Sequence, residues 1–386
     1  MRVLYDHQIL TLQNYGGISR YFCELMDQFS KDPGVEQILA LRYSYNENLC
    51  NHHFLHKYWS NKSEFLCATQ IFPTIQKVMH VNVLNCLRIN QRESVRLLRS
   101  QEFDLFHPTY YDPYFLQHLQ QKPFVLTVHD MIHELYPNYF SPDDPTKIQK
   151  KKLIERADAI IAISESTKRD IIKFTNVDPD QISVVYHGNP LEYLDQTTPN
   201  KSNFDRLALE SYILFVGNRS GYKNFIFFIK SVAKLLKENE NLHIYCAGGG
   251  PFTQPELKIF DELNITSKIQ FIRTNDLIMK NLYENAYVFV FPSLYEGFGL
   301  PILEAFSCGC PALLSDSSSL SEVGADAACY FDPTNPESLT QSIETVISDN
   351  HYRERLIKKG FERLKLFSWE KAAQDTKSVY QGLLNQ

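Results

Sequence analysis

The sequence predicts an α/β protein with two doubly wound parallel sheets, and three observations lead to this fold class. A length of 386 residues suggests two domains. Short apolar runs, such as 124–128 and 288–291, are typical of strands that are buried on both faces of a sheet. Amphipathic helical segments alternate with these strands in both halves, which is the pattern of parallel α/β sheets.

A polar stretch rich in Pro, Asn and Thr runs from residue 191 to about residue 206 and has the composition of a linker. We therefore place the first domain at 1–190 and the second at 191–368, with a final helix at 369–386. No repeat of sequence relates the two halves, so they are expected to share architecture only.

The composition excludes several classes of protein. Hydrophobic residues make up 44% of the chain and charged residues 22%, as in ordinary globular proteins. The net charge of −6 argues against nucleic-acid binding. Apolar runs are too short to cross a bilayer, and Met1–Asp6 leads directly into a strand without a signal peptide. The 8 cysteines lack metal-type pairing, so thiols in a reducing cytosol are expected.

The segment from Val288 to Ala305 organises the prediction of a site. An apolar strand at 288–291 precedes the glycine loop 296–299, and Pro301 stands in the first turn of a helix. This arrangement offers backbone N–H groups to an anion. Glu296 and Glu304 flank the loop, and carboxylates accept strong hydrogen bonds from hydroxyls. A nucleotide sugar combines both chemistries; the alternative is a surface glutamate and an acid that favours the first helical turn.

The sequence E-G-F-G-L-P-x-L-E-A at 296–305 resembles the Glu-x7-Glu segment of the retaining glycosyltransferases numbered family 4. The resemblance covers nearly the whole chain and is weakest between about Asn46 and Leu98. It implies the GT-B fold, in which two Rossmann-like domains face a central cleft and the last helix, 369–386, completes the first domain. It also implies transfer of a sugar from a nucleoside diphosphate to an acceptor hydroxyl.

Arg219 and Lys223 follow a predicted strand at 212–216 and are flanked by glycines. One forked donor and one point charge suit a diphosphate, although in an unplaced loop the two residues would mean little. They resemble the family's G-R...K pair, with an extra Asn before the Arg. The resemblance implies that both residues offset the charge that grows on the leaving diphosphate.

The resemblance assigns further residues to the donor. Glu304 would hold the ribose, and Glu296 would hold the sugar. The glycine run 248–250 is similar to the family's G-x-G-P and would let the chain pass close to the nucleotide. The remaining contacts would come from the start of the central helix, from the glycine run and from a strand exit beside the base: Phe298, Gly299, Leu300, Gly248 and Arg273.

Two features of the first domain complete the predicted site. Gly16 and Gly17 precede a helix, where glycines permit close approach to phosphate but more often form a simple turn. In the family, such a pair faces the donor diphosphate and the acceptor; Arg20 either adds charge there or is a solvated cap. His129 ends the strand 124–128 and by resemblance lies beside the donor sugar. Asp130 would orient this imidazole, or His129 would bind a sugar hydroxyl directly.

Four arginines in a basic segment from 77 to 99 follow helical spacing and share one face: Arg88, Arg92, Arg96 and Arg99. A solvated helix face would explain them equally well. The functional alternative is contact with anionic lipid head groups or a phosphate-bearing acceptor. Because family members often sit on the inner face of the membrane, we expect a cytoplasmic protein that can be peripheral to that membrane.

Two negative features bear on mechanism. No Asp-x-Asp stands at a strand end, so we expect neither a metal nor another cofactor. No convincing nucleophile is found, and the family favours attack on the face from which the diphosphate leaves. The serine-rich loop 316–322 departs from the Gly-Gly-x-Pro-Glu of most relatives, which puts a contact of this loop with sugar or phosphate in doubt.

The donor is the least determined feature. The opening Y-D-H-Q-I-L and the A-D-A-A-x-Y-F-D-P at 325–333 resemble bacterial mannosyltransferases of O-antigen and other surface polysaccharides. GDP-mannose is therefore the first donor to consider, followed by UDP-sugars, with a glycan or a lipid-linked acceptor. Three rivals remain: a dinucleotide oxidoreductase, disfavoured because no G-x-G-x-x-G follows an early strand, a GT-B epimerase, and a non-catalytic glycan- or membrane-binding module.

Overall fold

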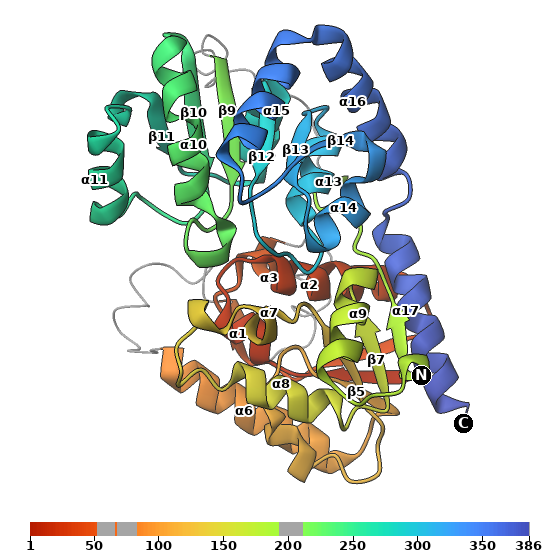
Figure 1. Cartoon of the computed structure of the whole chain (residues 1–386). Helices are drawn as coiled ribbons and strands as arrows, with labels where there is room; N and C mark the ends of the chain where they lie inside the picture. The colour runs from red at the N-terminus through yellow and green to blue at the C-terminus, as the bar shows by residue number, and fades with distance from the viewer. Residues whose placement is uncertain (52–65, 68–82, 193–210, 386) are drawn as a thin grey trace. The chain divides into compact units, whose positions relative to one another are not determined.

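The computed structural model describes residues 1–51, 66–67, 83–192 and 211–385 (Figure 1). The chain divides into two compact units: unit 1 comprises Met1–His187 with Trp369–Gln386, and unit 2 comprises Gly188–Ser368. Most of the linker predicted after residue 191, and the start of the basic segment at 77–82, lie outside the described residues.

Unit 2 contains a sheet of six parallel strands in the order β11-β10-β9-β12-β13-β14. The chain first adds strands on one side of β9 and then returns to add strands on the other side. The order therefore reverses between β9 and β12, which makes their carboxyl ends a topological switch point. The strands are β9 (Ser211–Val216), β10 (Leu242–Ala247), β11 (Ile269–Ile272), β12 (Val288–Phe291), β13 (Ala312–Ser315) and β14 (Ala328–Phe331).

Helices pack on both faces of this sheet because successive strand residues point in opposite directions. Ile213 and Phe215 of β9 join the core beneath α10, whereas the Tyr212 hydroxyl donates to the Leu282 carbonyl of α12 at 2.7 Å. The helices are α10 (Phe225–Glu238), α11 (Gln254–Glu262), α12 (Asp276–Asn285), α13 (Leu300–Ser307), α14 (Ser318–Gly324), α15 (Pro336–Ser348) and α16 (Asn350–Leu364). Figure 1 labels all of them except α12.

Unit 1 is built on two parallel three-stranded sheets, β2-β1-β5 and β6-β7-β8. A parallel bridge between Phe106 and Phe124 joins β5 to the start of β6, so the two sheets continue into each other. The strands are β1 (Arg2–Tyr5), β2 (Glu36–Leu39), β5 (Leu105–His107), β6 (Val125–Val128), β7 (Ala159–Ala162) and β8 (Ile182–Val184), with a small separate pair β3 (Tyr43–Ser44) and β4 (Leu66–Cys67).

Two helices of unit 1 agree with patterns in the sequence. Apolar residues at helical spacing from Ile18 to Phe29 predict a helix, which forms as α2. Ser164 and Ser166 are both candidate N-caps for the next segment, and Ser164 caps α9 by accepting a hydrogen bond from the Thr167 N–H at 3.0 Å. The helices of unit 1 are α1 (Gln8–Leu12), α2 (Gly17–Ser30), α3 (Glu47–Asn51), α6 (Val83–Ser100), α7 (Ile132–Leu135), α8 (Thr146–Ile154), α9 (Glu165–Phe174) and α17 (Trp369–Leu384).

One prediction in this unit was wrong. The weak periodicity of residues 46–64 and their many His and Asn residues predict a loop, but α3 spans Glu47–Asn51. The Asn46 side chain accepts a hydrogen bond from the Leu49 N–H at 3.0 Å and so acts as an N-cap. Leu49 is buried, which gives this short helix an anchor that weak periodicity could not reveal.

The last helix, α17, packs within unit 1 and is joined to its strands by a buried polar chain. The Tyr380 hydroxyl lies 2.6 Å from His107 Nδ1 and 3.1 Å from the Tyr5 hydroxyl. His107 Nε2 lies 2.8 Å from the Thr127 hydroxyl. Burial lowers the pKa of His107 to about 3, so this imidazole is neutral at physiological pH and its two nitrogens link β5 to α17 and β6.

Candidate active site

Lys223 and Glu296 meet at the switch point of unit 2. Lys223 ends the 3₁₀ turn Gly221–Lys223 that follows β9, and Glu296 lies in the loop that follows β12. Because β9 and β12 are neighbours, these loops leave the same edge of the sheet side by side. Lys223 Nζ lies 2.6 Å from Glu296 Oε1, and the two side chains are 17% and 13% exposed. The structure thus brings these two predicted residues together.

Serines from the next strand exit fix the Glu296 loop. The Ser318 hydroxyl accepts a hydrogen bond from the Glu296 N–H at 2.9 Å. The Ser319 hydroxyl donates to the carbonyls of Glu296 at 2.8 Å and of Phe298 at 3.0 Å. These hydroxyls therefore position the loop that carries Glu296, a role that the sequence did not indicate.

The helix predicted after this loop is confirmed as α13, with Pro301 in its first turn. Gly299 has a φ of 104°, and a Cβ atom there would lie 2.9 Å from Ile302 Cδ1, so a glycine is needed at this N-cap. Phe298 is buried edge-on against Phe367, while Leu300 is half-buried. The backbone at 298–300 is thereby held in one conformation at the helix N-terminus.

Glu304 lies one turn further along α13 and is half-buried. The hydroxyl of Tyr283, a fully buried residue of α12, donates to Glu304 Oε2 at 2.9 Å. This bond fixes one carboxylate oxygen, since Tyr283 itself cannot move without disturbing the core. Tyr283 is a positioning residue that no motif in the sequence indicates.

Arg219 is held by a set of partners that the sequence did not predict. It donates from Nε to Glu256 at 2.7 Å, from Nη1 to the Gly248 carbonyl at 2.8 Å, and from Nη2 to the carbonyls of Gly250 and Pro251 at 2.8 and 3.0 Å. Its side chain is 4% exposed, and its guanidinium lies 4.9 Å from the centre of the Phe252 ring. A direct contact with a diphosphate stays a prediction and would require Arg219 to exchange these partners.

The loop after β9, which carries Arg219 and Lys223, is therefore bonded to the loops on both sides of it. Arg219 joins the exit of β9 to the glycine run after β10, whereas Lys223 joins it to the exit of β12. Gly248, Gly249 and Gly250 have φ values of 85°, 69° and 74°, and a Cβ on Gly248 would lie 3.3 Å from the Gly217 backbone. Glycine at 248 is thus required by the close approach of the β9 and β10 loops.

Glu256 accepts from Arg219 and completes a capping box at the start of α11. Its Oε2 accepts from the Thr253 N–H at 2.7 Å, and the Thr253 side chain accepts from the Glu256 N–H. Burial opposes its ionisation, but Arg219 and Thr253 hold the pKa of Glu256 below its usual range. The Thr-x-x-Glu spacing reveals the cap in the sequence, but it does not reveal the guanidinium.

Arg273 follows β11 and is exposed. Because the sheet order is β11-β10-β9, this residue leaves the sheet two strands away from the switch point. The structure does not bring Arg273 into contact with Lys223, Glu296 or Glu304, and its predicted contact with the base stays a prediction.

His129 lies at the carboxyl end of β6 in unit 1. Its ring packs edge-on against Tyr21 and Phe22 of α2, with ring centres 5.5 and 6.1 Å apart. Burial lowers the pKa of His129 to about 4, so the imidazole is neutral at physiological pH. Within the described part of the chain its ring nitrogens have no hydrogen-bond partner, and Asp130 instead accepts from the Ile132 N–H at 3.1 Å.

Gly16 and Gly17 form the start of α2, with Gly16 as the N-cap. The Gln13 carboxamide accepts from the Ser19 N–H at 3.2 Å, and a Cβ on Gly16 would lie 2.5 Å from Gln13 Oε1. Gly16 therefore makes room for Gln13 at this helix end. Arg20 is buried and donates to the Tyr15 hydroxyl at 2.8 Å, so it is not the solvated cap considered from the sequence.

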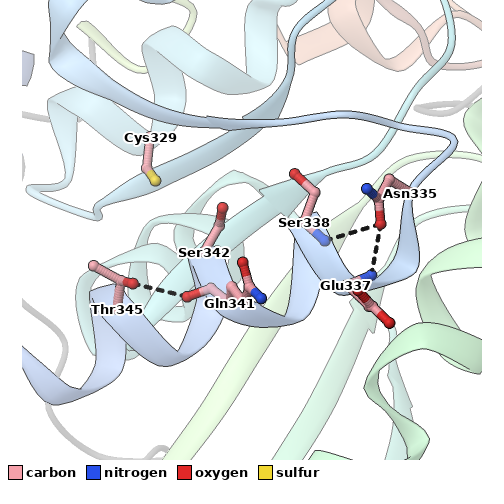
Figure 2. A pocket seen from close by; sticks show the side chains of 7 residues that line it. All are labelled: Cys329, Asn335, Glu337, Ser338, Gln341, Ser342 and Thr345. Carbon is pink, nitrogen blue, oxygen red and sulfur yellow. Dashed lines mark hydrogen bonds between the residues drawn. The ribbon is translucent and has the colours of Figure 1, made fainter.

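Two surface pockets lie elsewhere in unit 2. One, of about 340 Å³, borders β14 and the first turns of α15 (Figure 2). Its side chains bond to the backbone: Asn335 accepts from the Glu337 N–H at 3.0 Å, and Thr345 donates to the Gln341 carbonyl at 2.8 Å. The other, of about 520 Å³, lies near the start of β9. Neither contains a predicted site residue.

Comparison with known families identifies the chain. Residues 15–193 match the model described as Glycosyltransferase Family 4, and residues 200–363 match that of Glycosyl transferases group 1. The chain belongs to glycosyltransferase family 4. It is therefore an enzyme, a glycosyltransferase, and the dinucleotide oxidoreductase considered from the sequence is set aside.

Relatives of this glycosyltransferase include two bacterial mannosyltransferases. O-antigen chain mannosyltransferase B of Escherichia coli is 28% identical over 304 residues, which cover 76% of this chain and 78% of the relative. O-antigen chain mannosyltransferase RfbU of Salmonella typhimurium is 31% identical over 225 residues, covering 57% and 60%. An uncharacterised glycosyltransferase of Methanocaldococcus jannaschii is 28% identical, covering 69% and 70%.

Solved structures share the fold. Sucrose-phosphate synthase from Thermosynechococcus elongatus superposes with a TM-score of 0.73 at 19% identity, covering 100% of this chain and 99% of the other. Anabaena HepE, in complex with UDP and glucose, gives a TM-score of 0.71 at 16% identity and covers 100% of both chains. At these identities the likeness concerns the fold alone, and it confirms the GT-B class.

Replacing Arg219 by methionine is expected to destabilise the protein by about 3 kcal/mol, because the charged carboxylate of Glu256 then loses its buried partner. Thermal or urea unfolding would measure this loss. The double variant Arg219→Met with Glu256→Gln should lose less than the sum of the two single variants. Lys234→Met, which breaks an exposed ion pair on α10, is the control and should be nearly neutral. Unchanged stability with lost affinity for nucleoside diphosphates would instead make Arg219 a ligand clamp.

Proposed function

We propose that this glycosyltransferase moves a hexose from a nucleoside diphosphate sugar to a hydroxyl of a glycan or lipid-linked acceptor, with retention of configuration. The contact between Lys223 and Glu296 at the switch point carries the proposal. The names of the two O-antigen mannosyltransferases favour mannose as the sugar and surface polysaccharide or lipopolysaccharide synthesis as the context, which makes GDP-mannose the first donor to test. UDP-sugars come next, since HepE is solved with UDP-glucose.

The ion pair suits a donor in which an anionic phosphate group is joined to a hydroxylated sugar. A diphosphate would pair with the Lys223 ammonium, and the Glu296 carboxylate would then accept hydrogen bonds from the hydroxyls of the sugar. One ion pair is exchanged for another, so neither charge is left without a partner in a half-buried site. The 2.6 Å contact between Lys223 and Glu296 supports a proposed site in which the phosphate and sugar subsites are adjacent.

The remaining groups complete the proposed donor site. Glu304, with Oε2 fixed by Tyr283, would accept hydrogen bonds from the ribose hydroxyls. The N-terminus of α13 at Gly299 and Leu300 adds a partial positive charge near the phosphates. As the bond from C1 to the phosphate oxygen breaks, Lys223 and this helix end would offset the growing negative charge. In this proposal they supply the stabilisation that other transferases take from a metal ion.

Retention follows, in this proposal, from attack on the face that the diphosphate leaves. The acceptor oxygen bonds to C1 while the C1–phosphate bond breaks, and the acceptor proton passes to the departing phosphate oxygen. His129 would contribute a neutral imidazole that hydrogen-bonds a sugar hydroxyl, because its lowered pKa prevents it from carrying a charge at neutral pH.

We further propose an anionic membrane surface as a partner of α6. Arg88, Arg92, Arg96 and Arg99 are all exposed, and Ile89 between them is 37% exposed. Glu93 neutralises part of this face, since it pairs with Arg96 at 2.7 Å and with Arg42 at 3.1 Å. No helix among the described residues is both long enough and apolar enough to cross a membrane. A cytoplasmic, peripheral protein fits these features.

The function is tested by incubating the purified protein with GDP-mannose and a panel of UDP-sugars, with and without chelator, and following release of nucleoside diphosphate. Product from GDP-mannose that survives chelation is expected. A donor converted to an isomer without acceptor would indicate an epimerase instead, and the absence of both release and thermal stabilisation by every nucleotide would contradict the proposal.

Lys223→Ala and Glu304→Ala should affect different kinetic constants. Lys223→Ala is expected to lower kcat by about 10²-fold or more, because its charge matters most as the diphosphate leaves. Glu304→Ala should mainly raise the Kd for the nucleotide, by about tenfold, since it removes a charged hydrogen-bond acceptor of the ribose. Steady-state kinetics with calorimetry measure both. Unchanged nucleotide affinity in Glu304→Ala would reject its ribose role.

Replacing the four arginines of α6 by glutamine should release the protein from vesicles that contain anionic lipid, because each basic residue near such a surface contributes about 1 kcal/mol. Co-sedimentation at low ionic strength measures the effect. The matched control replaces four exposed lysines of unit 2, Lys230, Lys234, Lys237 and Lys258, which changes the net charge equally. Equal loss in both variants, or no loss in either, would leave the arginines as a solvated face.

A further inference from the structure

Lys150 of α8 is a lysine with no exposure to solvent. Its ammonium donates to the Asp130 carbonyl at 2.9 Å and lies 2.8 Å from Glu134 Oε2 and 3.6 Å from Asp130 Oδ1. All three oxygens belong to the turn and short helix that follow β6, directly after His129. The sequence places Lys150 in a run of three lysines, but Lys151 and Lys152 are exposed.

A buried ammonium is costly unless oxygens surround it, so its partners are held in fixed positions. Glu134 is itself only 6% exposed, which makes the ion pair with Lys150 an internal one. Although burial opposes the charge of Asp130, the Lys150 ammonium holds the pKa of that carboxyl below its usual range. The segment 130–134 is thereby fixed from α8.

The backbone around His129 is held from two sides. The Tyr111 hydroxyl accepts a hydrogen bond from the His129 N–H at 2.9 Å, and Lys150 binds the carbonyl of the next residue, Asp130. Lys150 Nζ also lies 5.8 Å from the centre of the Tyr111 ring. Lys150, Tyr111 and the 129–130 backbone therefore form one connected unit, and the packing of His129 on Tyr21 completes it.

The charge of Lys150 also acts on the imidazole. Burial lowers the pKa of His129, Asp130 raises it, and Lys150 lowers it again, so the ammonium opposes the neighbouring carboxylate. The titratable groups that face His129 come from six parts of unit 1: Asp130 from its own turn, Lys150 from α8, Tyr21 from α2, His107 from β5, Tyr111 from the segment after β5 and His187 from the segment after β8.

We propose that Lys150 is a positioning residue for His129: it fixes the turn that carries the imidazole, and its charge opposes that of Asp130 at the ring, so that His129 meets its ligand in a fixed place. The part of this inference that concerns the ligand, a sugar hydroxyl, rests on the proposed function. The part that concerns His129 itself does not.

The test measures the protonation of His129 directly. Ring-labelled histidine would be titrated by NMR in the wild type and in Lys150→Met, with the His129 signal assigned by its loss in His129→Gln. Lys150→Met is expected to raise the pKa of His129 by about one unit, because the charge of Asp130 then acts on the imidazole unopposed. Lys150→Arg keeps the positive charge and should shift the pKa of His129 less. Lys151→Met and Lys152→Met on the same helix are matched controls and should not shift it.

Lys150→Met leaves Glu134 as a buried unpaired charge and can fail to fold for that reason. The double variant Lys150→Met with Glu134→Gln removes both charges of the pair, and in it Asp130 should still raise the pKa of His129. An unchanged pKa of His129 in whichever of these two variants folds would overturn the proposal.

Kinetics separates this inference from the proposed function. In the Lys150→Met or double variant, the acid limb of the pH profile of kcat/KM should move to higher pH by the shift that NMR records for His129, which a merely structural loss would not produce. If the wild type transfers no sugar, the proposed function fails while the NMR result still decides the role of Lys150. An acid limb that stays in place in an active variant would contradict the positioning role.

Discussion

The candidate site depends on the ion pair between Lys223 and Glu296. The two residues are 73 positions apart and meet because the strand order of unit 2 reverses between β9 and β12. In a sheet wound in one direction only, β10 and β11 would lie between β9 and β12, and the loops after β9 and β12 would be separated by these two strands. The fold therefore creates a place where one positive and one negative side chain share a half-buried environment, and a ligand with a phosphate next to hydroxyls can satisfy both.

Side-chain bonds to the backbone keep this edge of the sheet in shape. Arg219 fixes the loop after β9 to the glycine run after β10, and Ser318 and Ser319 fix the loop after β12 from the β13 side. Each of these hydrogen bonds joins the loops that follow two neighbouring strands, so the loops are preorganised although they contain several glycines. Preorganised groups stabilise charge without first having to rearrange, which is what electrostatic catalysis requires.

The sequence predicted the features that are encoded locally. The strand, glycine loop and helix around 288–305 could be read from a single stretch, and a family resemblance gave Lys223, Glu296 and Glu304 their proposed roles. It could not predict partners that are distant in the chain. In the sequence, Arg219 resembles a phosphate ligand. The Glu256 carboxylate that binds it in the fold lies 37 residues away, so the local sequence does not reveal this partner. Likewise, nothing in a run of three lysines distinguishes the buried Lys150 from its solvated neighbours, because burial is a property of the packed fold.

Calorimetric titration of GDP and UDP into Glu296→Gln, alongside the wild type, tests the central claim most directly. These nucleotides lack the sugar that Glu296 would bind, so the variant removes only the partner that competes for Lys223. The account predicts binding several-fold tighter than in the wild type, because the diphosphate no longer has to displace a carboxylate from the ammonium. Weaker or unchanged binding in Glu296→Gln would contradict it, since the diphosphate would then not take the place of Glu296 at Lys223.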